Sequence, residues 1–112
     1  YSLEYGIPLG VAPETIAAIL SRNPGAKAVI IVNPTYHGIT SDISSIAAIV
    51  HQHNIPLLVD EAHGPHLGFH EDLPQSALEA GADAVLAGTA FMTSPRPAQT
   101  VASFVNAFRE DA

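Results

Sequence analysis

The sequence predicts an α/β fold, a two-layer or three-layer sandwich in which a short parallel sheet of about three strands is flanked by about four helices. Short apolar runs alternate along the chain with longer segments whose apolar residues recur at helical spacing, which is the pattern of strands linked by helices. The apolar runs lack polar alternation, as is typical of strands that are covered on both faces.

The first half of the chain predicts two helices and the first strand. Pro13 fits the first position of a helix that ends at residues 23–25, because proline suits a helix start and glycine follows helix ends. Residues 28–32 form the first strand, and Thr40 or Ser41 caps the second helix. The apolar positions that predict the two helices are Ile16, Ile19, Leu20, Ile43, Ile46, Ala47 and Val50.

The second half predicts two further strands and two further helices. Residues 57–59 form the second strand and residues 85–87 the third, with a short helix over residues 73–80 between them. Ser94 and Pro95 open the final helix. The apolar stripe of that helix is Val101, Phe104, Val105 and Phe108.

The predicted sheet needs cover beyond its linking helices. Right-handed crossovers place the helices that link parallel strands on one face. The second face and the two edges then require cover from the N-terminal helix, the C-terminal helix or a second copy of the chain. We expect a homodimer, because closed twofold pairing is the commonest outcome for an exposed apolar surface.

Composition excludes several classes of function. The chain has 112 residues, which predicts a single domain over residues 1–112, and it has no cysteine for disulfide or thiolate chemistry. A net charge of −7 with four basic residues disfavours nucleic acid and anionic membranes, since both partners require Lys and Arg to replace counterions. The apolar runs are too short for a transmembrane helix and the N-terminus lacks a signal-peptide layout, so we expect a cytoplasmic protein.

Two acids follow the second predicted strand at once. Residues 56–59 read PLLV and lead directly into Asp60 and Glu61, where the strand leaves the sheet. In open parallel α/β sheets, ligands bind at the carboxyl ends of the strands. Adjacent carboxylates point to opposite faces of a strand, so these two make a poor acid–base pair. Glu61 is expected to be a solvated loop acid.

The surrounding segments resemble a known enzyme family. Residues 56–70 read PLLVDEAHGPHLGFH and residues 33–38 read NPTYHG; together they resemble the large domain of the Orn/Lys/Arg decarboxylases, fold type I enzymes that use pyridoxal phosphate (PLP). The resemblance covers about residues 5–85. It implies that Asp60 pairs with the pyridinium nitrogen of PLP and that His63 belongs to the same site.

One element of that resemblance is missing. After the Gly-Ala-Asp of residues 81–83, the family continues with a strand and a Ser-x-His-Lys segment whose lysine bonds covalently to PLP, whereas this chain has Ala90 and Phe91 at those positions. The only lysine, Lys27, lies just before the first strand, at the opposite end from the crevice. We therefore expect no catalytic residue, no bound cofactor and no decarboxylase activity. Asp60 is then a relic that caps a helix or accepts backbone N–H bonds.

The last part of the chain resembles a different family. Residues 80–95 read AGADAVLAGTAFMTSP, which resembles the last βα unit of phosphate-binding TIM barrels such as indole-glycerol-phosphate synthase. The resemblance covers about residues 79–109 and implies that Gly88, Thr89 and the helix at Ser94 hold a phosphate or sulfate ion. The alternative is a small-residue turn that packs strand against helix. We interpret the chain as a chimera of a decarboxylase-like segment 1–80 and a barrel-like segment 81–112. Both resembled families place such consecutive strands side by side, so the resemblances imply the strand order 1-2-3.

The histidines of the chain match no metal motif. Imidazole and carboxylate are ligands that suit zinc, nickel or copper, but the spacing fits no structural zinc site, so we expect no native metal and only adventitious binding. His51 and His53 lie at the end of the second helix and are interpreted as partners of its dipole. The histidines considered as ligands are His37, His63, His66 and His70.

Three hypotheses follow. The favoured one is a non-catalytic α/β scaffold, designed or recombined, that binds no cofactor. The second is a remnant PLP-binding decarboxylase fragment, and the third is a small module that binds a phosphate ligand. An absorbance titration with PLP separates the second hypothesis from the other two.

Overall fold

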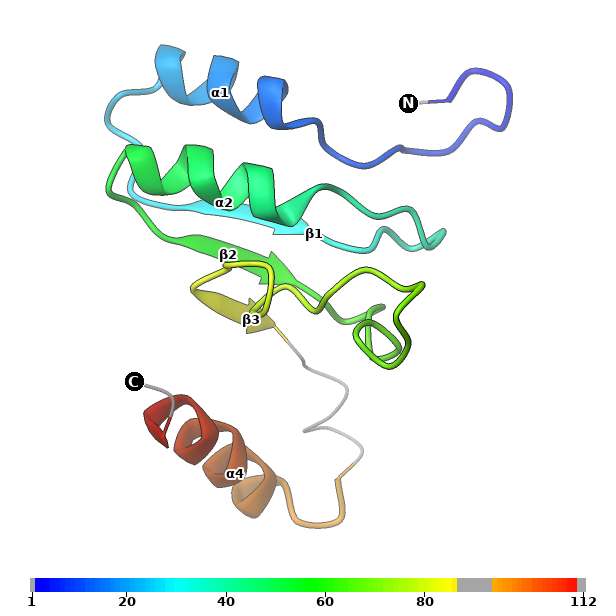
Figure 1. Cartoon of the computed structure of the whole chain (residues 1–112), viewed down its shortest axis with the longest axis vertical. Coiled ribbons are helices and arrows are strands. Elements are labelled where there is room, and N and C mark those ends of the chain that lie inside the picture. The colour runs from blue at the N-terminus through cyan, green and yellow to red at the C-terminus, as the bar shows by residue number, and fades with distance from the viewer. Residues whose placement is uncertain (1, 87–93, 111–112) are drawn as a thin grey trace.

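Three parallel strands form one sheet in the order β1-β2-β3 in the computed structural model, which describes residues 2–86 and 94–110 (Figure 1). The strands are β1 (Val29–Val32), β2 (Leu57–Asp60) and β3 (Ala84–Leu86). The predicted α/β class and strand order are confirmed. The register pairs Val32 with Asp60 and Asp60 with Leu86, so the carboxyl ends of the three strands lie level with one another.

Three helices accompany the sheet within the described residues, namely α1 (Pro13–Arg22), α2 (Ile43–Gln52) and α4 (Pro97–Glu110). Pro13 stands at the start of α1, as predicted. The cap of α2 is Asp42, whose side chain accepts from the backbone N–H of Ser45, and not Thr40 or Ser41. Ser41 is engaged elsewhere, because its hydroxyl accepts from the N–H of Val11 at 2.8 Å.

The expected helix over residues 73–80 is not formed. The segment makes consecutive turns, in which the N–H of Ala80 donates to the carbonyl of Ser76 at 3.0 Å and that of Gly81 donates to Leu78 at 3.1 Å. A segment this short gains little stability from helical hydrogen bonds, because ordering the backbone of the first turn costs more free energy than its first hydrogen bond contributes. The hydrogen bond between Ala77 and Glu61, described below, therefore helps to determine the conformation of this segment.

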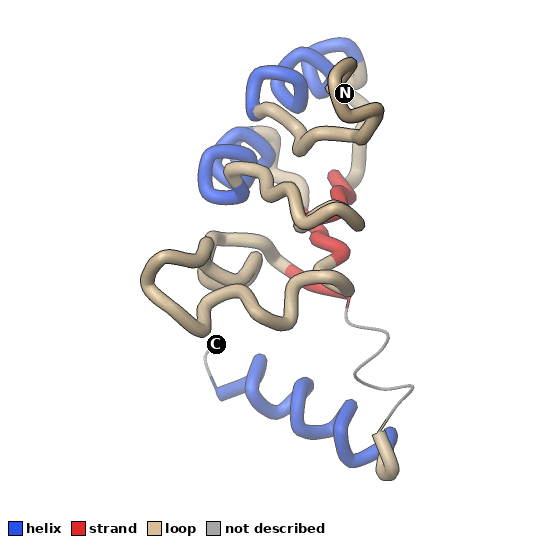
Figure 2. The backbone as a smooth tube through the Cα atoms, turned by 90° about the vertical axis from the view of Figure 1, so that its right-hand side faces the viewer, coloured by secondary structure: helices blue, strands red, loops and turns tan. Residues whose placement is uncertain are grey.

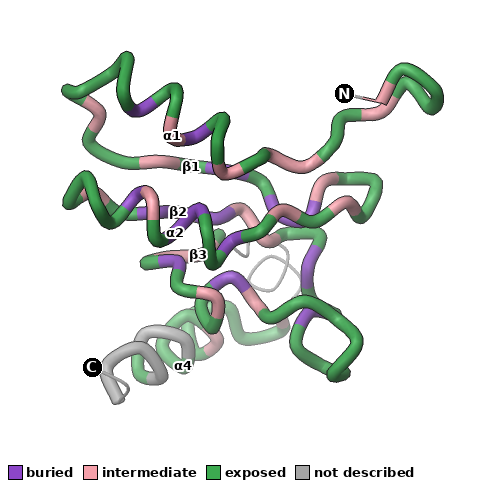
Figure 3. The backbone as a smooth tube through the Cα atoms, turned by 45° about the horizontal axis from the view of Figure 1, so that its top comes forward, coloured by how far each residue is buried: buried purple, intermediate pink, exposed green. Residues whose placement is uncertain are grey.

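The hydrophobic core lies between one face of the sheet and the layer of α1 and α2. Both helices lie on the same side of the strands (Figure 2), and the buried positions follow the strands and the inner faces of the helices (Figure 3). The buried cluster consists of Ile16, Leu20, Ile31, Ile43, Ile46, Ala47, Val50, Leu57, Val59, Ala77 and Ala82. Ile19, which the helical spacing also predicted as buried, is exposed on α1.

The opposite face of the sheet is uncovered within the described residues, contrary to the expectation of burial on both faces. Ile30 is 65% exposed, Val32 48% and Leu86 49%. Helix α4 lies beyond β3, apart from the layer of α1 and α2 (Figure 1). It begins at Pro97 and not at Ser94, and the side chains of Phe104, Val105 and Phe108 lie outside the described residues. The described fold is therefore a two-layer sandwich.

Candidate functional site

Two loops meet at the carboxyl ends of β1 and β2. Asn33 follows β1, and its N–H donates to the carbonyl of Asp60, the last residue of β2, at 2.9 Å. The loop after β1 spans residues 33–41, and the loop after β2 spans residues 61–67. In open parallel α/β sheets, ligands bind in a crevice at the carboxyl ends of the strands.

Internal hydrogen bonds fix the loop of residues 33–41. Asn33 is 1% exposed, and its side-chain oxygen accepts from the N–H of Ser41 at 2.7 Å. The N–H of Thr35 donates to the carbonyl of Ile39 at 2.8 Å. The peptide bond between Asn33 and Pro34 is cis, and Pro34 is fully buried. This segment is thus a closed strand-exit turn whose buried polar group is satisfied.

Asp60 is half-buried at the edge of the sheet. Its Oδ1 accepts from the N–H of Ala62 at 3.1 Å, which confirms that this carboxylate accepts a backbone N–H. Within the described residues no hydrogen bond reaches Oδ2. The side chain is therefore oriented by its own loop.

His63 lies beside Tyr36, which comes from the neighbouring loop. The two ring centroids are 5.5 Å apart with an interplanar angle of 88°, and Tyr36 makes a similar edge contact with His37 at 5.4 Å. Sequence reasoning singled out His63 but missed Tyr36 as its partner. Only the parallel pairing of β1 with β2 brings the two loops together, so no local pattern could have revealed the contact.

Glu61 is not the solvated loop acid that the sequence predicted. Its Oε1 accepts from the N–H of Ala77 at 2.8 Å, and this bond joins the loop after β2 to the turns that replace the expected helix. Burial raises the pKa of Glu61 above its ordinary value, opposed by the Ala77 N–H and assisted by the nearby charge of Glu79. A carboxylate held in this way supports the fold of the site.

Two other histidines, His51 and His70, make contacts with nearby aspartates. His51 pairs with Asp83, with 2.8 Å between Nε2 and Oδ2, in addition to its place in the last turn of α2. The same Oδ2 accepts from the N–H of Leu57 at 2.7 Å, and the His51 bond is the main cause that lowers the pKa of Asp83. His70 contacts Asp72 at the surface. In the part of the chain that the structure describes, no three His, Asp or Glu side chains converge on a metal position.

Two residues of the predicted phosphate site, Gly88 and Thr89, lie outside the described residues. The third, Ser94, uses its hydroxyl locally. Its Oγ lies 2.7 Å from Oγ1 of Thr100 and accepts from the N–H of Arg96 at 3.1 Å. Phosphate binding by this segment therefore stays a prediction.

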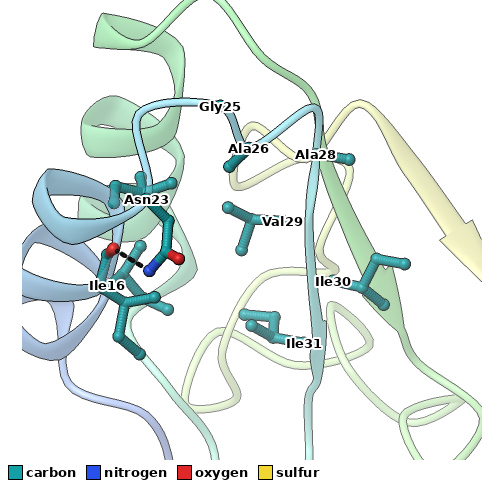
Figure 4. A pocket seen from close by; sticks show the side chains of 10 residues that line it. Ile16, Asn23, Gly25, Ala26, Ala28, Val29, Ile30 and Ile31 are labelled. Atoms are coloured by element: carbon teal, nitrogen blue, oxygen red, sulfur yellow. Dashed lines mark hydrogen bonds between the residues drawn. The ribbon is translucent and has the colours of Figure 1, made fainter.

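A wide apolar hollow lies along the outer edge of β1, away from Asp60. It measures about 650 Å³ and is bordered by α1, the α1–β1 turn and β1 (Figure 4). The amide of Asn23, one of its few polar groups, already donates to the carbonyl of Ile19 at 2.8 Å. A hollow without charged side chains suits an apolar protein surface better than a polar substrate.

Comparison with known proteins identifies the family. The family model described as "Orn/Lys/Arg decarboxylase, major domain" matches residues 1–108. The chain belongs to the Orn/Lys/Arg decarboxylase family. The family match runs through residue 80 without a break, so it gives no support to a change of fold family at that position.

Relatives in this decarboxylase family include "Arginine decarboxylase" of Bacillus subtilis (strain 168), which is 46% identical over 80 residues, covering 71% of this chain and 16% of the relative. "Arginine decarboxylase" of Halalkalibacterium halodurans is 46% identical over 78 residues, covering 70% of this chain and 16% of the relative. "Uncharacterized protein YaaO" of Bacillus subtilis (strain 168) is 41% identical over 100 residues, covering 89% of this chain and 19% of the relative. The chain thus spans less than a fifth of the length of these curated relatives. No solved structure matches it significantly.

A membrane-spanning helix is not found among the described residues, since none of their helices combines sufficient length with sufficient apolar character.

Proposed function

We propose that this chain is the part of a PLP-dependent decarboxylase domain that supplies Asp60 and His63 to the cofactor site, and that it does not catalyse decarboxylation by itself. The observation that carries the proposal is the position of Asp60, at the carboxyl end of β2 with one oxygen held by Ala62 and the other unbonded within the described residues. The family match over residues 1–108 supports the choice of cofactor.

The residues present fit the ring-nitrogen side of PLP. When bound, PLP supplies an electron sink for bond cleavage next to an amino group. Asp60 would hold a protonated ring nitrogen through a charge-assisted hydrogen bond, which is short and strong for an oriented carboxylate. His63 and Tyr36 would border the same position from the two loops.

The residues do not fit the covalent side of PLP. Lys27 precedes β1 and lies at the amino end of the sheet, opposite Asp60. Nucleophilic capture of a carbonyl cofactor requires an amine, and the sequence offers no other lysine. The interpretation of the chain as non-catalytic rests on this point, whereas its interpretation as a chimera or a design has no support from the family match.

The uncovered sheet face is consistent with a piece of a larger assembly. Ile30, Val32 and Leu86 form an exposed apolar face, and soluble proteins rarely leave such patches bare. The occupant is either more of the same domain, since the relatives are several times longer, or a second copy of the chain. We propose the second copy for this chain in isolation, and light scattering that reports a monomer at all concentrations would refute it.

A PLP titration followed by absorbance tests the proposed function. We expect reversible binding to the wild-type chain, weakened by Asp60→Ala because the carboxylate partner of the ring nitrogen is lost. Asp72→Ala is the matched control, since the side chain of Asp72 is 88% exposed in a loop. Equal PLP affinity of all three proteins, or no binding at all, would refute the assignment of Asp60.

Carbon dioxide release tests the second half of the proposal. We expect none from arginine, lysine or ornithine in the presence of PLP. Turnover by the purified wild-type chain would show that the missing lysine is not required and would overturn the non-catalytic assignment.

A further inference from the structure

The loop after β1 presents Tyr36 toward the loop after β2. Tyr36 is 80% exposed, yet its ring contacts two imidazoles edge to face, those of His37 and His63. His37 is the next residue in sequence, whereas His63 lies in the loop after β2. The contact with His63 is therefore a tertiary one and depends on how closely the two loops approach.

Both loops are fixed below the ring contact. The turn that carries Tyr36 is closed by the Thr35–Ile39 bond at 2.8 Å and by the N–H of Gly38, which donates to the carbonyl of Thr35 at 2.9 Å. The turn that carries His63 is closed by the N–H of Gly64, which donates to the carbonyl of Glu61 at 2.9 Å. The two rings therefore extend from rigid bases.

Gly64 sets the distance between these bases. A Cβ atom at this position would lie 2.9 Å from Cδ of Pro34 and 2.6 Å from Cγ of Glu61. Both distances are shorter than real Cβ contacts, so a larger residue would force a shift of the Glu61 side chain within the same loop and of Pro34 in the other loop. Glycine is thus needed here for close approach of the two loops, and that approach brings His63 to Tyr36.

We propose that Tyr36 is the positioning residue of His63, holding its imidazole in a fixed orientation through the edge-to-face contact that Gly64 permits. Aromatic pairs in this geometry are more favourable than the area they bury would predict. A side chain that is already ordered before a ligand binds loses less conformational entropy on binding. The inference rests on the proposed function for its purpose, because an oriented His63 serves the PLP site.

Proton NMR of the chain without PLP tests the positioning itself. We expect cross-relaxation between the Tyr36 and His63 rings in the wild type and in Tyr36→Phe, and its loss in Tyr36→Leu together with a shift of the His63 ring signals. Signals of His63 are identified by their absence in His63→Gln. Unchanged His63 signals in Tyr36→Leu, or no ring contact in the wild type, would overturn the inference.

Glycine substitutions provide a second, independent arm. Gly64→Ala should weaken the Tyr36–His63 contact, whereas Gly25→Ala should leave it intact, because a Cβ at Gly25 meets no atom within 4 Å. A full contact in folded Gly64→Ala would contradict the role of Gly64. If Gly64→Ala does not fold, the Tyr36 variants alone decide.

PLP affinity then separates this inference from the proposed function. Tyr36→Leu should raise the PLP dissociation constant about 2- to 10-fold, the size expected for the loss of one aromatic contact. Tyr36→Phe, which keeps an aromatic ring, should have the dissociation constant of the wild type. Wild-type affinity in Tyr36→Leu would overturn a role of this contact in binding. A wild type that shows the ring contact but binds no PLP would refute the proposed function and leave the positioning of His63 established.

Discussion

The two ends of the sheet are held in different ways. At the amino end, Asp83 accepts from His51 and from the N–H of Leu57, so one carboxylate oxygen joins α2, β2 and the start of β3. At the carboxyl end, the one hydrogen bond of the Asp60 carboxylate within the described residues comes from the N–H of Ala62, in its own loop. The first arrangement links elements that are distant in sequence, whereas the second only orients a side chain. We therefore expect Asp83 to matter for the stability of the fold, and the proposed function assigns Asp60 to a ligand.

The largest expected effect is at the amino end. Asp83→Ala removes the acceptor of the Leu57 N–H, which belongs to a fully buried residue. Leaving a buried donor without a partner costs about 1–3 kcal/mol, so the free energy of unfolding should fall by that amount in urea denaturation. Asp72→Ala, at an exposed loop position, should change it by less than about 0.5 kcal/mol. A loss no greater than that of the control would contradict the structural role of Asp83.

Acid should weaken the same end selectively. His51, and then the Leu57 N–H, lower the pKa of Asp83 below its ordinary 3.8. A carboxyl whose pKa is lower in the folded state contributes stability that is present above the unfolded pKa and is lost as pH falls through the folded one. We expect Asp83→Asn to remove part of the stability loss below pH 3.8, measured as the unfolding free energy at several pH values. An unchanged acid profile would show that this pair does not contribute.

Glu61, at the carboxyl end, should respond to pH in the opposite sense. Burial raises its pKa above the ordinary 4.5, so its contribution to stability is present below pH 4.5 and is lost as pH rises through the folded value. Glu61→Gln keeps an acceptor for the Ala77 N–H without the charge. We expect this variant to be at least as stable as the wild type at pH 7, with a flatter profile above pH 4.5.

Glu71→Gln, an exposed loop substitution, is the control for that profile. It should follow the wild type at every pH. Clear destabilisation of Glu61→Gln at pH 7 would mean that the charge of Glu61 supports the fold, contrary to this account.

Features of the fold that depend on local sequence were predictable, whereas features that depend on contacts between distant residues were not. The apolar runs of β1 and β2 and the helical spacing of α1 and α2 are local signals, and they were sufficient for the α/β class, whereas the order of the strands came from the resemblance to known families. The turns at residues 73–80 were not predicted, because the hydrogen bond between Glu61 and Ala77 joins residues 16 positions apart and has no local signal in the sequence. The prediction of Thr40 or Ser41 as the cap of α2 was wrong. Ser41 bonds instead to Asn33 and to Val11, and the bond to Val11, 30 residues away, has no local signal in the sequence.

The candidate site was predictable in part. The position of Asp60 followed from the strand pattern, but its pairing with PLP, and the inclusion of His63, came from resemblance to the family and not from spacing. The contact of Tyr36 with His63 and the close approach at Gly64 depend on the register of β1 with β2. Both contacts join two loops that are far apart in sequence, so no local pattern predicts them.

The smallest expected effect on stability is that of Asp60→Ala. Its carboxylate is half-buried with a single hydrogen bond in the described structure, and side chains tuned for function commonly contribute little to the fold. We expect the unfolding free energy to change by less than about 0.5 kcal/mol. A loss of more than about 3 kcal/mol would instead place Asp60 in a structural network.

The unfolding free energy of the wild type and of Asp60→Ala, each with and without saturating PLP, tests the contrast between the two ends most directly. A ligand that binds only the folded state stabilises it, by about 2.7 kcal/mol at a hundredfold excess over its dissociation constant. The account predicts that the two proteins are equally stable without PLP and that PLP stabilises the wild type more than the variant. Equal stabilisation of both proteins by PLP, or a variant that is strongly destabilised without it, would contradict the claim that Asp60 serves a ligand and not the fold.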